Sequence, residues 1–218
     1  MSQLRYFPIF LDLTKFRVLV VGGGRIGSKR ALKISKYCNN VTVYSLEFSQ
    51  ELQESKINLI KGDAKNIDEN FLKNYDIIFV ATNDQLVNKE ICLKAIKQGK
   101  LCNNPTDTDI SQFIMPIFYS DEDVEIAVTT YGKSSLVSKM ILDKIISNIL
   151  DDTTIRTAIE IMYDIKNYLK KKINDPSIRY RLYHEIFNDN DFEIFIKDNK
   201  IIEAKKRAEE IINEYSRK

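Results

Sequence analysis

The chain has 218 residues, 44% of them hydrophobic, which is enough for one large domain or two to three small lobes with real cores. Its 33 basic and 31 acidic residues leave a formal net charge of +2, which argues against nucleic acid as the main partner, because that function needs a clustered basic face. No apolar run suits a signal peptide or a membrane span, so we expect a cytoplasmic protein without membrane segments.

Strands and helices alternate over the first hundred residues. A β-branched strand at residues 18–21 runs into three glycines, and the residues after it fit an amphipathic helix. Further strands are expected at 40–45, 57–60 and 76–82, and a second clear helix at 83–98 is followed by Gly99 as a stop signal. This alternation predicts βαβ units and an α/β fold with a Rossmann-type parallel sheet.

The pattern changes after Gly99. Residues 100–116 are too polar for a buried strand, so they form either a plain loop or the reacting edge of an active site. Two strands joined by an acidic turn at 120–123 are expected next, and then a helix that starts near Ser134. Only helical spacing follows Asp151, with a turn around residues 174–177. We therefore predict a Rossmann domain at 1–112, a dimerisation and substrate lobe at 113–150, and a helical domain at 151–218.

Cysteine and histidine give no sign of a metal centre. Cys38, Cys92 and Cys102 are widely spaced, with no CxxC pair and no neighbouring histidine. We therefore expect three reduced thiols rather than a disulfide or a zinc site. The only histidine, His184, lies among aromatic residues of the tail, and we assign it no role.

The segment Gly22-Gly23-Gly24-Arg25-Ile26-Gly27 satisfies G-x-G-x-x-G between a predicted strand and a predicted helix. Gly22 permits the tight turn, Gly24 lets backbone amides approach a pyrophosphate, and Gly27 lets the helix pack on the strand. The phosphates would then meet the positive end of the helix beside Arg25 and Ile26. The alternative is a glycine-rich turn that binds nothing.

The ends of two other strands inform on the cofactor. NAD-binding folds often place an acid after the second strand, where this chain has Ser45, Leu46 and Glu47. No arginine follows to bind a 2′-phosphate, which favours NAD over NADP. Thr82 and Asn83 end the next buried strand and are expected beside the cofactor, although the same residues suit a helix N-cap.

Several stretches together resemble the precorrin-2 dehydrogenase family, the N-terminal module of siroheme synthases. They are "FPIFLDLTKFRVLVVGGGRIGSKRAL", "VTVYS", "IIFVATND", "FIMPIF" and "EIAVTTYGKSS", in the family's order from about residue 6 to about residue 149. The resemblance implies NAD-dependent oxidation of precorrin-2 to sirohydrochlorin in siroheme biosynthesis, in some members with iron insertion as well. It also implies a homodimer with a Rossmann lobe, a central dimerisation lobe and a helical C-terminal lobe.

The resemblance also gives the polar segment after Gly99 a possible role. The family has an aspartate here that is held to act in dehydrogenation, chelation or both. Counting from Cys102 to Phe113 without gaps places Thr106 at that aspartate and Asp107 one residue later. Either Asp107 takes its place after a small loop adjustment, or Thr106 replaces the acid; Asp109 is a weaker candidate. A carboxylate would accept the proton left after hydride removal, but these acids could also merely cap turns.

The segment "TTYGKSSL" is the candidate substrate contact. Ser134 suits an N-cap with Lys133 beside it, so the start of a helix would present free N–H groups. Such a site suits precorrin-2, which carries eight carboxylates. By similarity Thr130 lies near the same pocket. The alternative is an ordinary strand-to-helix turn.

A function of a different class stays open at this point. A Rossmann domain could also serve as a non-catalytic regulatory module that senses a dinucleotide. Such a module would ignore tetrapyrroles and would have no evident need for a second anion-binding helix start.

Overall fold

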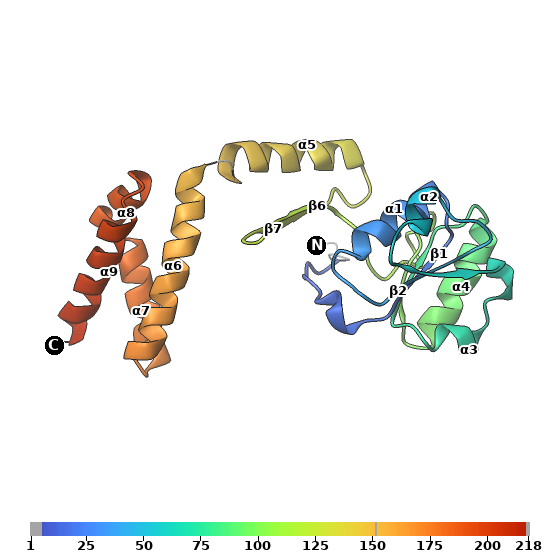
Figure 1. Cartoon of the computed structure of the whole chain (residues 1–218), viewed down its shortest axis with the longest axis horizontal. Coiled ribbons are helices and arrows are strands. Elements are labelled where there is room, and N and C mark those ends of the chain that lie inside the picture. Colours follow the sequence, from blue (N-terminus) through green and yellow to red (C-terminus); the bar gives the residue numbers. More distant parts are fainter. Residues whose placement is uncertain (1–5, 151, 217–218) are drawn as a thin grey trace, which may run out of the picture. The chain divides into compact units, whose positions relative to one another are not determined.

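The structure is a computed structural model that describes residues 6–150 and 152–216 (Figure 1). The chain folds as two compact units, Met1–Met115 and Pro116–Lys218. The division of the second unit into a dimerisation lobe and a helical domain stays a prediction.

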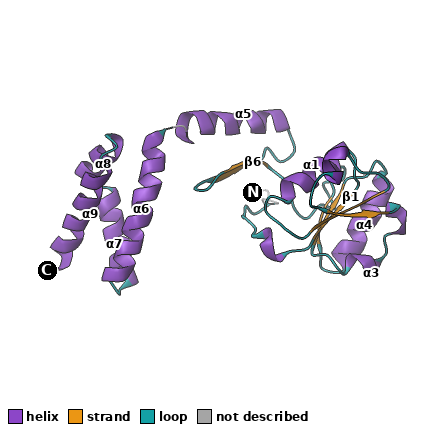
Figure 2. Ribbon diagram, in the orientation of Figure 1, coloured by secondary structure: helices purple, strands orange, loops and turns teal. Residues whose placement is uncertain are grey.

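The first unit is built on a five-stranded parallel sheet in the order β3-β2-β1-β4-β5. Helices lie on both sides of this sheet (Figure 2). The Rossmann-type α/β fold predicted from the sequence is confirmed. The strands are β1 (Val18–Val21), β2 (Val41–Ser45), β3 (Asn58–Lys61), β4 (Ile77–Val80) and β5 (Leu101–Asn103).

The two faces of the sheet are covered by different helices. Val18 and Val20 pack with Ala31 of α1 (Arg25–Ile34), whereas Leu19 and Val21 pack under α4 (Gln85–Lys97). Successive side chains of a strand point to opposite faces, so a strand covered on both sides must be apolar throughout. Shorter elements complete the unit: the 3₁₀ turns Leu13–Lys15 and Ala64–Asn66, and the helices α2 (Gln50–Gln53) and α3 (Glu69–Leu72).

An ion-pair cluster joins the amino ends of three strands. Asp76 precedes β4 and accepts hydrogen bonds from the backbone N–H and the guanidinium of Arg17, which precedes β1. Lys100, which precedes β5, lies 3.9 Å from the same carboxylate. The Arg17 hydrogen bonds are the main cause that lowers the pKa of Asp76 to about 2. Charge pairing therefore fixes the strand starts at the edge opposite the glycine turn.

Strand β5 corrects the expectation that residues 100–116 contain no buried strand. Cys102, Asn103 and Asn104 are all buried. Their polarity is tolerated because the Asn103 amide donates to the Phe113 carbonyl (2.8 Å) and the Asn104 backbone N–H donates to Ser111 Oγ (2.8 Å). Partners seven and ten residues away in the sequence thus replace the solvent, and a local polarity pattern does not show them.

The expectation of three reduced thiols is wrong for two of them. Cys92 of α4 and Cys102 of β5 form a disulfide with a Cα–Cα distance of 5.5 Å. Gly99, at a φ of 71°, ends α4 and lets the chain return beside the helix, which brings the two sulfurs together. Cys38 is free and buried, and its thiol donates to the Phe16 carbonyl.

The second unit begins with the antiparallel hairpin of β6 (Ile117–Ser120) and β7 (Glu125–Val128). Helix α5 (Ser135–Ile145) packs on this hairpin and continues into a π turn, Ile146–Leu150. The predicted hairpin and the predicted helical tail are both confirmed. The tail helices are α6 (Thr153–Lys172), α7 (Pro176–Phe187), α8 (Asn190–Lys197) and α9 (Ile201–Ser216).

The tail helices share an apolar core of their own, which includes Ile161, Leu182, Phe192 and Ala208. In the first turn of α6, Arg156 pairs with Asp121, which lies in the turn of the hairpin. Within 6–150 and 152–216, none of the helices combines the length and apolar character that a bilayer crossing requires.

We expect the Cys92–Cys102 disulfide to stabilise the first unit. Closing a loop between residues 10 positions apart should raise its free energy of unfolding by about 2–3 kcal/mol, because the crosslink restricts the unfolded chain. Urea unfolding with and without a thiol reductant measures this difference. The double variant Cys92→Ala/Cys102→Ala is the control, and its stability should not respond to the reductant. Equal stability of the wild type in both conditions would contradict the prediction.

Candidate active site

The glycine turn is seated directly on the ends of the neighbouring strands. Gly22 has a φ of 111°, and a Cβ there would collide with the carbonyl group of Ala81, just after β4. A Cβ on Gly27 would collide with the carbonyl oxygen of Gly22. At Gly24, in contrast, a Cβ would meet nothing within 4 Å. The turn is therefore closed toward the protein and open toward solvent, as expected for a backbone that approaches a ligand.

Helix α1 starts at this open side. Gly24 is its N-cap and supplies no side-chain acceptor, and the first turn holds no acidic residue. Arg25 and Ile26 are exposed beside these amides. The start of α1 thus offers backbone N–H groups and a positive dipole end to an anion, and these residues fit the pyrophosphate of a dinucleotide.

The ends of β2 and β4 flank the glycine turn, because both strands pair with β1. Ser45 and the backbone of Glu47 lie so close to Gly23 that a Cβ there would touch both. Leu46 is exposed on this rim, and Leu86 at the start of α4 is 80% exposed. The structure therefore brings the predicted cofactor residues Gly22, Gly24, Arg25, Ile26, Ser45, Leu46, Glu47, Thr82 and Asn83 to one edge of the sheet.

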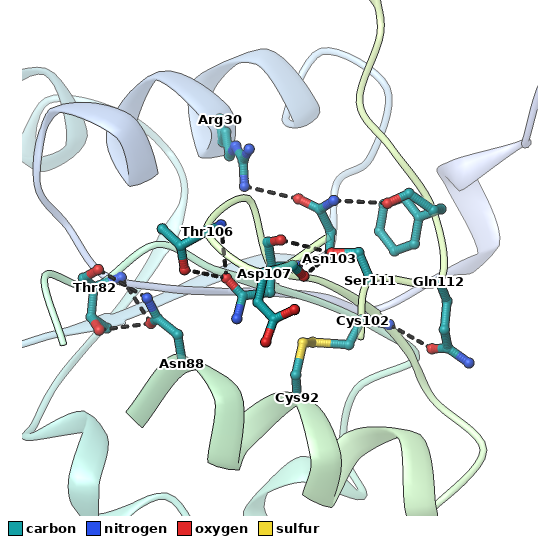
Figure 3. The surroundings of a disulfide bond; sticks show 12 residues. Arg30, Thr82, Asn88, Cys92, Cys102, Asn103, Thr106, Asp107, Ser111 and Gln112 are labelled. Atoms are coloured by element: carbon teal, nitrogen blue, oxygen red, sulfur yellow. Dashed lines mark hydrogen bonds between the residues drawn. A yellow bond between two sulfur atoms is a disulfide. The ribbon is translucent and has the colours of Figure 1, made fainter. Parts of the chain in front are cut away.

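Thr82 is held by a residue that the sequence reasoning missed. Asn88 of α4 is fully buried; its Oδ1 accepts from the backbone N–H (3.1 Å) and the hydroxyl (2.7 Å) of Thr82, and its Nδ2 donates to the Thr82 carbonyl (3.0 Å) (Figure 3). The N-cap of α4 is Asp84, so Thr82 and Asn83, for which the sequence also allowed this role, lie before the cap. The sequence offered one signal for this role. Asn88 lies between Val87 and Ile91, two apolar residues of the predicted helix that are buried, and a buried amide needs hydrogen-bond partners.

The loop after β5 is closed at its base by reciprocal hydrogen bonds. Gln112 donates its backbone N–H to the Cys102 carbonyl (3.0 Å), and its side chain accepts from the Cys102 N–H (3.0 Å). Inside this pair, Ser111 Oγ donates to the carbonyl of Asn104 (2.7 Å). Residues 104–111 thus form a loop with a fixed base beside the carboxyl end of β4.

Thr106 and Asp107 differ in how their side chains are engaged. The backbone N–H and the hydroxyl of Thr106 both donate to Asn104 Oδ1, at 3.0 and 2.7 Å. The Asp107 carboxylate accepts the backbone N–H of Asp109 at 3.2 Å and lies 3.9 Å from Lys89 Nζ, with 31% of its side chain exposed. Asp107 therefore presents a carboxylate at this edge, while the Thr106 hydroxyl is held by its own loop.

The predicted substrate residues lie in the second unit. Ser134 is the N-cap of α5, as expected, and its Oγ accepts from the N–H of Val137 at 3.2 Å. Thr130 Oγ1 accepts from the Ser134 N–H and donates to the Ser134 carbonyl, and Lys133 is exposed beside them. A role for Thr130, Lys133 and Ser134 in substrate binding stays a prediction.

Metal-ligating side chains do not gather anywhere in 6–150 or 152–216: no three residues of the His, Cys, Asp and Glu types form a group there that could hold an ion.

Comparison with known proteins gives relatives along nearly the whole chain. Residues 9–117 match the family described as "Putative NAD(P)-binding". A Methanocaldococcus jannaschii protein named "Putative precorrin-2 dehydrogenase" is 34% identical over 205 residues, which cover 90% of this chain and 96% of that protein. A Priestia megaterium protein named precorrin-2 dehydrogenase is 29% identical over 184 residues, 84% of this chain and 90% of that protein.

A solved structure and longer relatives agree with these matches. The structure of SirC, a precorrin-2 dehydrogenase, matches with a TM-score of 0.70 and 26% identity, covering 93% of this chain and all of that one. The siroheme synthase of Mannheimia succiniciproducens is 25% identical over 215 residues. That match covers 94% of this chain but only 43% of the synthase.

We expect Gly24→Asp to abolish dinucleotide binding without unfolding the protein. The new side chain has room, because a Cβ there meets nothing within 4 Å, but its charge would repel phosphates at the start of α1. Calorimetric titration with NAD and a thermal melt give the two readouts. Gly27→Ala is the matched control, since its Cβ collides with Gly22 and should lower the melting temperature. Undiminished NAD binding by Gly24→Asp would contradict the site.

Proposed function

The chain belongs to the precorrin-2 dehydrogenase family, and we propose that it oxidises precorrin-2 to sirohydrochlorin with NAD as the oxidant. The observation that supports this reaction most directly is the position of Asp107. Its partly exposed carboxylate follows β5, the strand next to β4, at the same edge of the sheet as the open side of the glycine turn. A dinucleotide-binding turn and a proton acceptor thus share one edge, as an oxidation of this kind requires.

The oxidation removes two electrons and two protons from the substrate. They leave as one hydride, which carries both electrons, and one proton. NAD, when bound, accepts the hydride from a saturated ring carbon. The chain's own part is to bind and to move the proton: the N–H groups at the start of α1 hold the pyrophosphate, and the Asp107 carboxylate accepts the proton and returns it to solvent. Exposed Ile26, Leu46 and Leu86 supply apolar contact around the cofactor.

We assign the proton-accepting role to Asp107 rather than to Thr106. A hydroxyl is a poor base at neutral pH, and that of Thr106 already donates to Asn104. The Asp107 carboxylate is partly exposed and lies 3.9 Å from Lys89 Nζ, so its oxygens face the open edge of the site. Asp109 stays the weaker candidate.

Other assignments from the sequence stay predictions. A non-catalytic sensor would bind NAD and leave precorrin-2 unchanged, so turnover separates it from an enzyme. Iron insertion into sirohydrochlorin is also a prediction, and no contact among the described residues favours it. The cytoplasmic location is also a prediction.

We also propose that two copies of the chain associate through the hairpin and α5. Helix α5 leaves a row of apolar side chains exposed in the second unit: Leu136 is 80%, Met140 50% and Ile141 37% exposed. Leu136 and Met140 are four residues apart, about one helical turn, so they share a face, and Ile141 follows Met140 at the side of that face. An apolar helix face of this kind is typical of a homodimer interface.

We expect Asp107→Asn to lower kcat for precorrin-2 oxidation by roughly 10²- to 10⁴-fold, because an amide cannot accept the proton. NAD affinity and melting temperature should stay nearly unchanged, since an asparagine keeps an acceptor oxygen for the Asp109 N–H. Anaerobic assays that follow NADH by absorbance measure the effect. Thr106→Val is the matched control and should retain most activity. The reverse order of the two variants would assign the role to Thr106.

We expect the wild type to be a dimer and the variant Leu136→Glu/Met140→Glu to be a monomer, because two carboxylates would have to be buried in the interface. Light scattering coupled to size-exclusion chromatography gives the mass. Tyr163→Glu, a change at an exposed residue of α6, is the control and should remain dimeric. A monomeric wild type would refute the proposal.

A further inference from the structure

Arg30 is a cation on α1 that lies near the candidate catalytic loop. Its side chain is half-buried, and its guanidinium donates to Asn103 Oδ1 at 3.0 Å. The same group lies 6.0 Å from the centre of the Phe79 ring. Figure 3 shows it reaching from α1 toward the end of β5, on the opposite side of the Asp107 loop from the Cys92–Cys102 disulfide. No role for Arg30 follows from the glycine motif, which ends before it.

The charge of Arg30 is not balanced within the described part of the chain. Of the other partly buried arginines, Arg156 pairs with Asp121 and Arg207 with Asp189, whereas Arg179 donates to two backbone carbonyl groups. Arg30 has no carboxylate partner in 6–150 or 152–216. Burial alone accordingly lowers the pKa of its guanidinium, which nevertheless stays charged at neutral pH. A partly desolvated cation without an anion costs stability, and an anionic ligand would offset that cost.

The partner of Arg30 connects it to the catalytic loop. Asn103 is the last residue of β5, and its Nδ2 donates to the Phe113 carbonyl at 2.8 Å, on the far side of the loop that carries Asp107. The guanidinium has five N–H donors, and among the described residues one of them is used, by Asn103, which leaves the others for a further acceptor. A carboxylate can take two of them in a fork, which is the preferred geometry for arginine.

We propose that Arg30 binds a carboxylate side arm of the tetrapyrrole substrate and so places the reacting ring beside Asp107. The inference rests on the proposed function, since it needs a polycarboxylate substrate at this edge. The alternative is that Arg30 only supports the loop through Asn103. The two roles differ in what they change: substrate binding affects KM and ligand affinity, whereas loop support affects kcat and stability.

The variant Arg30→Gln separates these roles, because its amide can still donate to Asn103 but carries no charge. We expect its KM for precorrin-2 to rise roughly 10- to 100-fold, the value of one or two charge-assisted hydrogen bonds, while NAD affinity is unchanged. Its affinity for uroporphyrin, a stable octacarboxylate tetrapyrrole, should fall by a similar factor in a fluorescence titration without turnover. Asn103→Ala, which breaks the link to the loop and keeps the cation, is the matched control and should retain uroporphyrin affinity.

Unchanged KM and uroporphyrin affinity in Arg30→Gln would overturn the inference and leave the proposed function standing, provided that the wild type oxidises precorrin-2. If Arg30→Gln melts early, Arg30→Lys serves instead: the charge remains but the fork is lost, so a rise in KM supports the inference and a fall in kcat alone contradicts it. A wild type that neither oxidises precorrin-2 nor binds uroporphyrin would refute the proposed function itself, and the inference with it.

Discussion

The close seating of the glycine turn between β2 and β4 is the constraint on which the site depends. A Cβ at Gly22 would collide with the backbone after β4, and one at Gly23 with the backbone of Glu47 after β2. The turn can therefore follow β1 only without side chains, and in that position it directs the start of α1 to solvent. The open space at Gly24 is the consequence, and it is where the backbone can approach a phosphate.

The rest of the edge is held by buried polar groups rather than by apolar packing alone. Asn88 fixes Thr82, Ser111 fixes Asn104, and Asn103 connects Arg30 to Phe113. Hydrogen bonds of this kind define distances and directions more narrowly than apolar contacts do, and their loss would leave buried groups unpaired. A loop held in this way can keep a carboxylate in place without a rigid secondary structure around it.

The sheet could be predicted from the sequence because its signals are local. The run Val18–Val21, the glycines after it and the apolar run before Thr82 each follow from the chemistry of a few adjacent residues. The N-cap at Ser134 and the stop at Gly99 are local in the same sense. Placing the cofactor residues on one edge needed only the rule that parallel strands end on the same side.

Features that depend on distant partners could not be predicted in this way. Strand β5 looked too polar because Asn103 and Asn104 find their partners in Phe113 and Ser111, across the loop. The Cys92–Cys102 disulfide depends on the return of the chain beside α4, and its sequence spacing matches no known motif. Arg30 belongs to the same group, since a basic residue on a helix is ordinarily solvated and only its burial beside β5 distinguishes it.

The most direct test of the account is a single-turnover reaction without oxygen, in which the purified protein is mixed with precorrin-2 and NAD. NADH and sirohydrochlorin have separate absorbance bands, so both can be followed in one experiment. The account predicts that they form at the same rate and in equal amounts, because one hydride leaves each substrate molecule. If NAD binds while the tetrapyrrole spectrum stays unchanged, the edge around Gly24 and Asp107 is a dinucleotide site without this chemistry, and the account is wrong.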